Sequence, residues 1–347
     1  MAEHPIPLSV LDLAPVGRGS SPAQALRNSI DLVQRVERLG YQRHWVAEHH
    51  NMPGIASSSP PVLLAHLASV TDTIRLGSGG LMLPNHAALA VAEQFGMLEA
   101  LHPGRIDLGI GRAPGTDPVT ATALRRGPGM LGADDFPEQL TELLGFFDGS
   151  LPAGHPYEHI TAVPARGYRP AIWMLGSSTY GAHAAAVLGM PYSFAYHFAP
   201  AMLDDALAAY RSSFRPSAQL AAPYTMLGVS VVCGESDEHA RWLAAPGALA
   251  FLRLRQGRPD VYPSPEEAAE YRFTPFERQQ VEGWTASHVV GGPETVRHEL
   301  EELVERTGVD ELMVTTMVHA HDERVASYER LASVMRVEAV GAGGRPD

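Results

Sequence analysis

The chain has almost no cysteine. Its 347 residues include a single one, Cys233. One thiol excludes an internal disulfide and a zinc site built from several thiolates. Cys233 lies in an apolar, strand-like segment, so we expect a packed core residue rather than a nucleophile. The fold must therefore rest on its hydrophobic core, which 45% apolar residues can supply.

Positive charge and long apolar runs are also scarce. Lys and Arg number 26 against 39 Asp and Glu, which gives a formal charge of -13. This balance argues against nucleic acid and anionic membranes as partners. No window approaches the roughly 18 to 20 apolar residues of a membrane helix, and the N-terminus lacks a basic segment followed by an apolar one. We expect a cytoplasmic protein.

What the chain does contain is a regular alternation of short strand-like and longer helical segments. No shift in composition marks a domain boundary, so we expect a single domain over residues 1–340. Eight alternations in one chain predict a parallel sheet closed into a (β/α)8 TIM barrel, with a doubly wound open sheet as the competitor. The expected strands are residues 6–13, 43–47, 74–83, 106–110, 171–175, 192–195, 225–233 and 311–316.

Two segments interrupt the alternation. Residues 112–135 form a Gly/Pro-rich stretch that is too long for an ordinary connection, and loops of that length are usually functional or mobile. The segment from Arg253 to Glu282 is charged, carries four prolines and breaks the helical period. We therefore expect an insertion over about residues 253–285, and a disordered tail over residues 341–347.

In such a barrel, catalytic groups collect on the loops that follow the strands. The stretch VAEHHNMPG follows the second expected strand and places Glu48, His49 and His50 there. Adjacent residues point to opposite faces, so only one of the two histidines should face the barrel mouth. A metal site, an acid–base group and hydrogen bonds to loop backbone all remain open. The chain has 16 histidines but no HExxH motif, which disfavours a metal.

The stretch LGSGGLMLP carries three glycines within four positions, Gly77, Gly79 and Gly80. Glycine inside a strand costs roughly 0.5 to 1 kcal/mol relative to alanine. The pattern predicts either a bulge at the barrel rim or a flat group packed against the backbone.

Two further strand ends offer groups for an anion. Arg112 follows the fourth strand, where its guanidinium can bind an anion bidentately or pair with a surface acid. Gly176, Ser177, Ser178 and Thr179 follow the fifth strand and open a helix. Free N–H groups, hydroxyls and the helix dipole favour a phosphate there, while N-capping by Ser178 or Thr179 is the structural alternative.

Taken together, WVAEHHNMPG, RLGSGGLMLPNH, EQFGMLEALHPGRIDLGIGRAPG, WMLGSS and VVGGPETV resemble, in this order, the bacterial luciferase-like family of flavin-dependent monooxygenases. The resemblance covers nearly the whole barrel. It implies a (β/α)8 barrel with an insertion before the last strand, and reduced FMN bound at the carboxyl end of the barrel.

The resemblance also implies roles for single residues. Gly79 and Gly80 would form a bulge under the isoalloxazine ring, where family members often carry a non-prolyl cis peptide. Glu48 would lie near the flavin, and His49 matches the residue that family luciferases use in catalysis, so both are predicted catalytic residues.

Arg112 would hold the FMN phosphate together with the turn of Gly176, Ser177, Ser178 and Thr179. The position of Tyr196, after the sixth strand, matches an aromatic residue beside the flavin. The reactive cysteine that luciferases place before the matching arginine is Gly111 here, and no long-chain aldehyde site is recognisable. Both departures weaken any claim of light emission.

The activity implied is that of a two-component monooxygenase. A separate reductase would supply FMNH2, and a flavin C4a-hydroperoxide formed with O2 would epoxidise or hydroxylate an organic substrate. Abundant Ala, Arg, Gly and Pro fit a high-GC genome, and the subgroup occurs in polyketide tailoring, so we suggest an aromatic polyketide. The alternatives are an F420-dependent hydride-transfer reductase and a non-catalytic flavin-binding relative. A homodimer is expected because relatives of this fold commonly form one.

Overall fold

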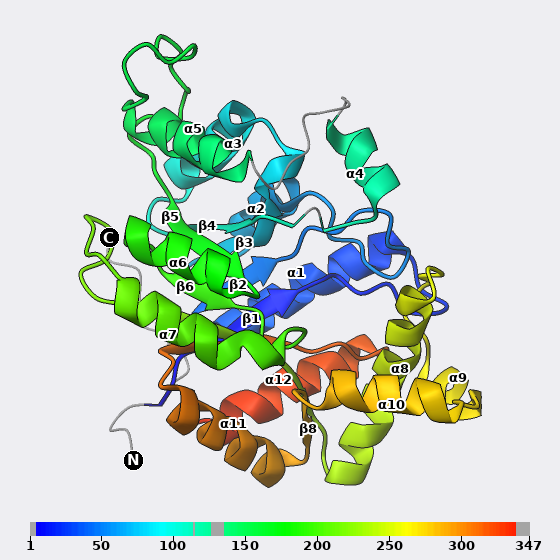
Figure 1. Ribbon diagram of the computed structural model, residues 1–347. Helices are drawn as coiled ribbons and strands as arrows, with labels where there is room; N and C mark the ends of the chain where they lie inside the picture. Colours follow the sequence, from blue (N-terminus) through cyan, green and yellow to red (C-terminus); the bar gives the residue numbers. More distant parts are fainter. Residues whose placement is uncertain (1–4, 114, 126–134, 338–347) are drawn as a thin grey trace.

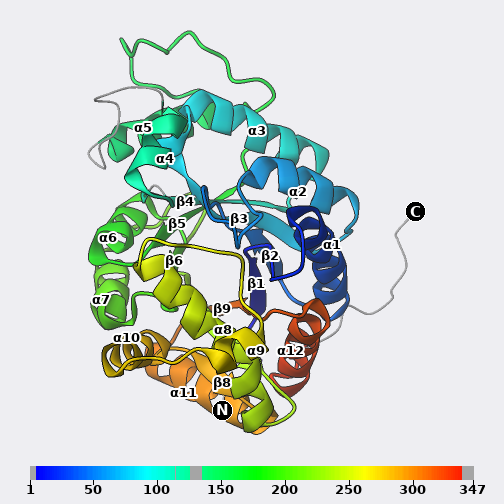
Figure 2. The same ribbon diagram turned by 90° about the vertical axis from the view of Figure 1, so that its right-hand side faces the viewer.

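The computed structural model describes residues 5–113, 115–125 and 135–337, and in this part of the chain a closed parallel barrel lies at the centre (Figure 1). In Figure 2 the strands occupy the middle and the helices surround them. The sheet runs in the order β6-β5-β4-β3-β2-β1-β9-β7, and pairing between β6 and β7 closes it. The barrel strands are β1 (Leu8–Asp12), β2 (Arg43–Val46), β3 (Arg75–Met82), β4 (Ile106–Gly111), β5 (Ala171–Gly176), β6 (Tyr192–Phe194), β7 (Thr225–Cys233) and β9 (Glu311–Thr315).

Helices form the outer layer because each carries one apolar stripe that must be buried. In the first of them, Ser21 caps the helix by accepting a hydrogen bond from Gln24 N at 3.2 Å, and Leu32, Val33 and Val36 are fully buried against the sheet. The outer helices are α1 (Pro22–Arg38), α2 (Pro60–Ser69), α3 (Ala88–Leu101), α5 (Phe136–Asp148), α6 (Thr179–Leu188), α7 (Leu203–Ser213), α8 (Asp237–Arg255), α11 (Pro293–Thr307) and α12 (His321–Val334).

The predicted TIM barrel is confirmed, with one strand more than expected. The additional strand β8 (Val289–Gly291) pairs with β7 outside the closed ring. Its three residues include Gly291 and are followed by Gly292, and this pattern is too short to predict a strand. The last barrel strand is therefore β9, at the position expected for the eighth strand.

The long stretch after β4 is not all loop, and the expectation of one uninterrupted loop was wrong. It contains helix α4 (Pro118–Arg125), whose first N–H groups, those of Val119 and Thr120, donate to the Asp117 carboxylate at 3.0 Å. Residues 126–134 of that stretch, and the expected tail over residues 341–347, lie outside the described residues.

The segment expected as an insertion carries two short helices, α9 (Pro265–Glu270) and α10 (Pro275–Thr285). Two of its prolines occupy the first helical positions, directly after the capping residues Ser264 and Thr274. The prolines therefore start helices here. No helix of the described chain is long and apolar enough to cross a membrane.

The amino end of the barrel is sealed by buried charge. Arg43 lies 2.9 Å from Asp107 Oδ2 and 3.0 Å from Glu311 Oε1, and both carboxylates are fully buried. Trp45 and Trp173 form the next layer, with ring centroids 5.2 Å apart in an edge-to-face arrangement. Packed side chains thus fill the amino end in the described part of the chain, while the strand-end loops surround the carboxyl end.

Candidate active site

Glu48 ties together two of the loops at the carboxyl end. Its side chain is fully buried and accepts hydrogen bonds from Met82 N at 2.9 Å, Asn85 Nδ2 at 3.0 Å, His50 Nε2 at 2.9 Å and His86 Nε2 at 3.0 Å. Burial alone would raise the pKa of the Glu48 carboxyl, but these hydrogen bonds and the neighbouring His86 outweigh it and lower the pKa. Glu48 thus holds the loop after β2 against η1 (Leu83–Asn85), the turn after β3.

The side chains of His49 and His50 contact different groups, as expected because neighbouring side chains point in opposite directions. Its Nδ1 lies 3.2 Å from Gly115 O, and its backbone N–H donates to Ser57 O at 3.0 Å. A carbonyl only accepts, so Nδ1 carries the proton and Nε2 keeps its lone pair. Burial lowers the pKa of His49, which favours the neutral ring near neutral pH.

The bulge predicted in β3 is present. The register against β4 shifts between Ser78 and Leu81, and the Gly79-Gly80 peptide bond is cis. Gly77 has a separate purpose, because a Cβ atom there would lie 2.6 Å from Trp45 Nε1. The glycine run therefore combines a packing requirement at Gly77 with an irregular strand end at Gly79-Gly80.

Arg112 stands beside the turn between β5 and α6. Its guanidinium carbon lies 4.1 Å from the ring centroid of Tyr180, in the first turn of α6, and it forms no ion pair with any residue that the structure describes. Ser178 is the N-cap residue, yet its hydroxyl makes no capping hydrogen bond within the described chain. Its carbonyl accepts from Tyr192 Oη at 3.2 Å, which fixes the turn. An unpaired cation and uncapped helix N–H groups thus share one corner of the mouth.

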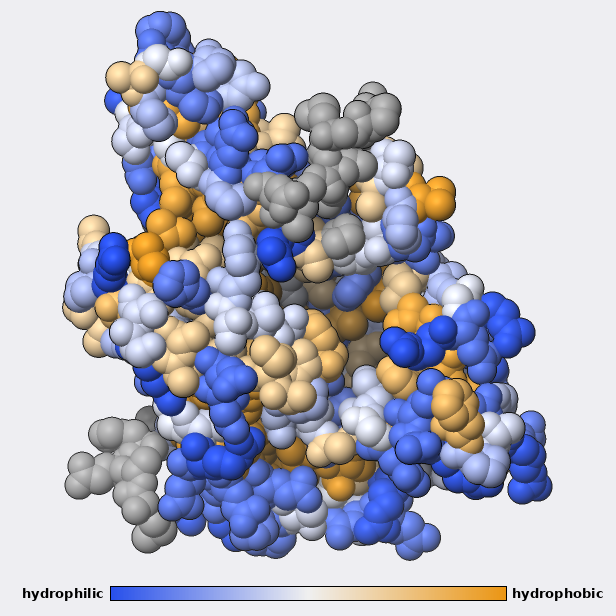
Figure 3. All heavy atoms as spheres, in the orientation of Figure 1, coloured by the Kyte–Doolittle hydropathy of each residue, from blue (hydrophilic) through white to orange (hydrophobic). Residues whose placement is uncertain are grey.

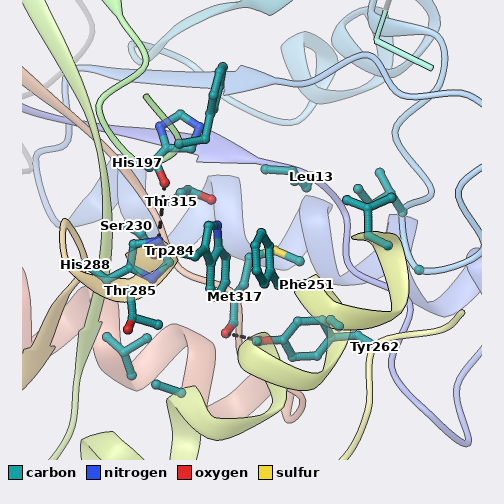
Figure 4. A pocket seen from close by; sticks show the side chains of 18 of the residues that line it. Leu13, His197, Ser230, Phe251, Tyr262, Trp284, Thr285, His288, Thr315 and Met317 are labelled. Carbon is teal, nitrogen blue, oxygen red and sulfur yellow. Dashed lines mark hydrogen bonds between the residues drawn. The ribbon is translucent and has the colours of Figure 1, made fainter. Parts of the chain in front are cut away.

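A cavity of about 280 Å³ occupies the opposite side of the mouth, between the ends of β7, β9 and β1 and the helix α8. An apolar hollow is visible on this face of the molecule in Figure 3. We call it the aromatic cavity because rings form much of its wall, as Figure 4 shows. Its aromatic side chains are Phe198, Phe251, Tyr262 and Trp284, together with the imidazoles of His197 and His288.

His197 lines the aromatic cavity and lies near His49. Its Nδ1 lies 3.1 Å from Gly228 O, so Nδ1 carries the proton, as in His49. Burial first, and then the proximity of His288 and His49, lower the pKa of His197 to about 4. The ring is therefore neutral at neutral pH. Gly228 lets this ring pack closely, because a Cβ atom on it would lie only 3.0 Å from His197 Nδ1.

Tyr196 lies apart from the aromatic cavity. It borders a separate depression with residues of α11, among them Leu303 and Arg306. The two residues that follow it, His197 and Phe198, line the aromatic cavity instead. From the sequence, His197 stands out only as one of several histidines near strand ends. No sequence pattern assigns a role to Phe198, Asn85 or His86.

The described residues include no group of three or more His, Cys, Asp or Glu side chains arranged to hold a metal ion. The imidazoles of His50 and His86 are engaged by the Glu48 carboxylate. The site consequently offers acid–base groups, an anion corner and an apolar cavity.

Comparisons with known proteins agree with this geometry. The family model for luciferase-like monooxygenases matches residues 6–311. The chain is 47% identical over 329 residues to the uncharacterized protein YvbT of Bacillus subtilis (strain 168), covering 95% of this chain and 96% of the relative. It is 44% identical over 342 residues to a luciferase-like monooxygenase of Escherichia coli (strain K12), covering 98% and 100%. The crystal structure of apo-MsnO8 superposes with a TM-score of 0.88 at 36% identity, over 96% of this chain and 100% of that one. The chain belongs to the luciferase-like monooxygenase family.

Proposed function

We propose that the chain is the oxygenating component of a two-component monooxygenase in the cytoplasm. It binds FMNH2 that a separate reductase supplies, and it uses O2 to oxygenate a small organic substrate. One observation carries the proposal: an anion corner and an apolar cavity open at the same barrel mouth, and burial favours the neutral imidazoles of His49 and His197 there.

The anion corner fits the phosphate of FMN. Arg112 has no carboxylate partner among the described residues, and the Ser178 hydroxyl is not consumed by capping. We assign the phosphate to Arg112 and to Gly176, Ser177, Ser178 and Thr179, whose backbone and hydroxyls lead into the positive end of α6.

The irregular end of β3 fits the flat ring system. Gly79 and Gly80 carry no side chains, and we assign the ring to this edge of the mouth. The predicted aromatic neighbour Tyr196 borders the depression beside α11 instead, so this assignment does not include it. When bound, reduced flavin supplies the electrons with which O2 is activated.

His49 is proposed to accept and donate the proton that oxygen transfer requires. Its Nδ1–H is fixed on Gly115 O, so Nε2 is the atom that accepts or returns a proton at the mouth. Glu48 positions this loop through the four hydrogen bonds that its carboxylate accepts. By the resemblance, Glu48 also lies near the flavin. The apolar wall of the aromatic cavity excludes water from the same space.

The substrate is proposed to be an aromatic compound that is hydroxylated or epoxidised, and an aromatic polyketide remains the suggestion. The rings of Phe251 and Trp284 in the cavity wall support an aromatic substrate.

A homodimer is also proposed. Val62 on α2 is 72% exposed, and Met97 and Leu101 on α3 are 53% and 67% exposed, which is apolar surface that a second copy would cover. Light scattering after size exclusion should give twice the chain mass of 37.3 kDa.

The cofactor assignment is tested by anaerobic titration with FMNH2 and, separately, with F420H2. We expect a saturating spectral change with FMNH2 and none with F420H2 at the same concentration. The reverse result would replace the monooxygenase with a hydride-transfer reductase. Binding of FMNH2 without O2 consumption above that of the reductase alone, over a panel of aromatic compounds, would indicate a non-catalytic relative.

A further inference from the structure

The wall of the aromatic cavity is preformed by rings that hold one another in place. Trp284 and Phe251 are stacked, with centroids 4.7 Å apart and an interplanar angle of 8°. His288 meets Trp284 edge-on at 4.3 Å and 77°. Tyr262 is fixed by a hydrogen bond from its hydroxyl to Met317 O at 2.7 Å (Figure 4). The segment from α8 to β8 thus supplies a rigid aromatic wall facing the ends of the barrel strands.

Two polar atoms in this wall are left for a ligand. Thr315 is 5% exposed and lines the cavity, and its hydroxyl has no hydrogen-bond partner in the described part of the chain. A buried hydroxyl without a partner is costly, so a ligand that bonds to it is favoured. The Nε2 atom of His197 also forms no hydrogen bond with a described residue, and it can only accept while the ring is neutral.

Positive charge is missing from the wall. Among the described residues that line the cavity, Asp260 is the one with an ionised side chain, and Arg18 already pairs with it at 2.7 Å. Burial keeps the pKa values of His197 and His288 below the ordinary histidine value. A carboxylate or phosphate in this cavity would lose its hydration without gaining a counter-charge.

We propose that the aromatic cavity binds a neutral molecule of one or two rings, which places a hydroxyl group between Thr315 Oγ1 and His197 Nε2, and that it excludes the carboxylate of the same ring system. The volume of about 280 Å³ is just below the roughly 300 to 1,000 Å³ of small-molecule sites, which limits the ligand to one or two rings. Resting on the proposed function, this molecule is the organic substrate of the monooxygenase. Thr315 and His197 then determine its orientation, and the missing cation determines its charge.

The test uses a matched pair of probes, naphthol and naphthoate, titrated into the flavin-free full-length protein and followed by calorimetry. Naphthol should bind at least tenfold more tightly than naphthoate at neutral pH. Trp284→Leu and Phe251→Ala should each weaken naphthol binding about tenfold or more. The control is Trp242→Leu on α8, a tryptophan that is 43% exposed and does not line the cavity, and it should leave binding unchanged.

The Thr315→Val variant tests orientation separately, because valine keeps the shape and removes the hydroxyl. We expect naphthol to bind severalfold more weakly to this variant, and naphthalene, which lacks the hydroxyl, to bind as before. Equal losses for both compounds would show that Thr315 acts only in packing and would overturn its role in orientation. Circular dichroism and the unfolding midpoint confirm that each variant is folded.

Naphthoate binding as tight as naphthol would overturn the proposal, as would unchanged naphthol binding in both aromatic variants. Displacement of naphthol by saturating FMN would also overturn it, because the cavity would then belong to the cofactor. Failure of the proposed function has a different signature. In that case naphthol binds as described, but FMNH2 either does not bind or supports no oxygenation.

Discussion

The two sides of the barrel mouth differ in the properties that decide which ligand they bind. The side that we propose for the cofactor, which we call the cofactor side, lies at the ends of β3, β4 and β5. It presents glycines, hydroxyls, uncapped helix N–H groups and the exposed cation of Arg112. The aromatic cavity, between β7, β9, β1 and α8, presents stacked rings and no free cation among its described lining residues. Groups suited to an anion and groups suited to an apolar ring thus lie at different strand ends.

His197 lines the aromatic cavity, and His49, which lies near it, contacts the loop after β4. Each imidazole is fixed by a carbonyl, that of Gly115 or Gly228, and each has a pKa below the ordinary value. Changes on the cofactor side should alter flavin binding, and changes in the aromatic cavity should alter substrate binding. Only changes in the two histidines should alter the amount of product formed per FMNH2 consumed.

The largest expected effect is that of Arg112→Ala. Loss of a charged hydrogen bond to phosphate should cost roughly 1.5 to 3 kcal/mol, or about a ten- to hundredfold rise in the Kd for FMN. Riboflavin, which has no phosphate, should bind equally to both proteins, and so should naphthol. Fluorescence titration measures all three. An equal loss of riboflavin affinity would mean that Arg112 does not contact the phosphate.

The next effect is a dependence of stability on pH that originates in the aromatic cavity. The pKa of His197 is about 4 in the folded chain against an ordinary 6.5, so between these values the unfolded chain binds more protons. The free energy of unfolding therefore falls as the pH drops through this window, by about 2 kcal/mol between about pH 7.5 and pH 5. Urea unfolding at both pH values should show a smaller fall for His197→Gln. The same fall in the variant would assign the effect to other histidines, such as His49 and His288, whose pKa values burial also lowers.

Glu48→Gln should have a somewhat smaller effect, confined to the cofactor side. An amide cannot accept hydrogen bonds from all four donors, so about 1 to 2 kcal/mol of unfolding free energy should be lost. Naphthol binding should be retained. Glu305→Gln on the exposed face of α11 is the matched control and should change neither quantity. Unaltered stability of the Glu48 variant would show that the loops do not depend on the carboxylate.

The smallest change in binding is expected for His49→Ala, where FMN affinity should stay within about twofold of the unaltered protein. What should change is coupling, with severalfold less product and more hydrogen peroxide per FMNH2 consumed, because the proton that directs oxygen transfer is no longer controlled. The control is His298→Ala, a histidine on the exposed face of α11. Full product yield from the His49 variant would remove this residue from the mechanism.

The barrel was predictable because alternation of strands and helices is a local property of the sequence. The strand-end positions of Glu48, His49 and Arg112 followed from it, since each comes directly after an expected strand. Helix α4 was not predicted, because the high glycine and proline content of residues 112–135 is typical of a loop. The one sequence feature that marks the start of the helix is the capping carboxylate of Asp117.

The aromatic cavity was not predictable in the same way. Phe251 and Trp284 stack although they are far apart in sequence, and only the tertiary fold brings them together. The strand β6 ends at Phe194, and the direction of its following loop decides that His197 and not Tyr196 lines the cavity. Gly77 likewise could not be assigned to the Trp45 indole without the sheet register.

The most direct test of the central claim follows oxygen through the complete reaction. The protein is supplied with FMNH2 by a reductase, with isotopically labelled O2 and with the neutral aromatic compound that binds best, and the product is analysed by mass spectrometry. The account predicts a product that gains one labelled oxygen atom, and loss of this product both in Arg112→Ala at limiting FMN and in Trp284→Leu. A product without the label, or a reduced product formed only with F420H2, would contradict it.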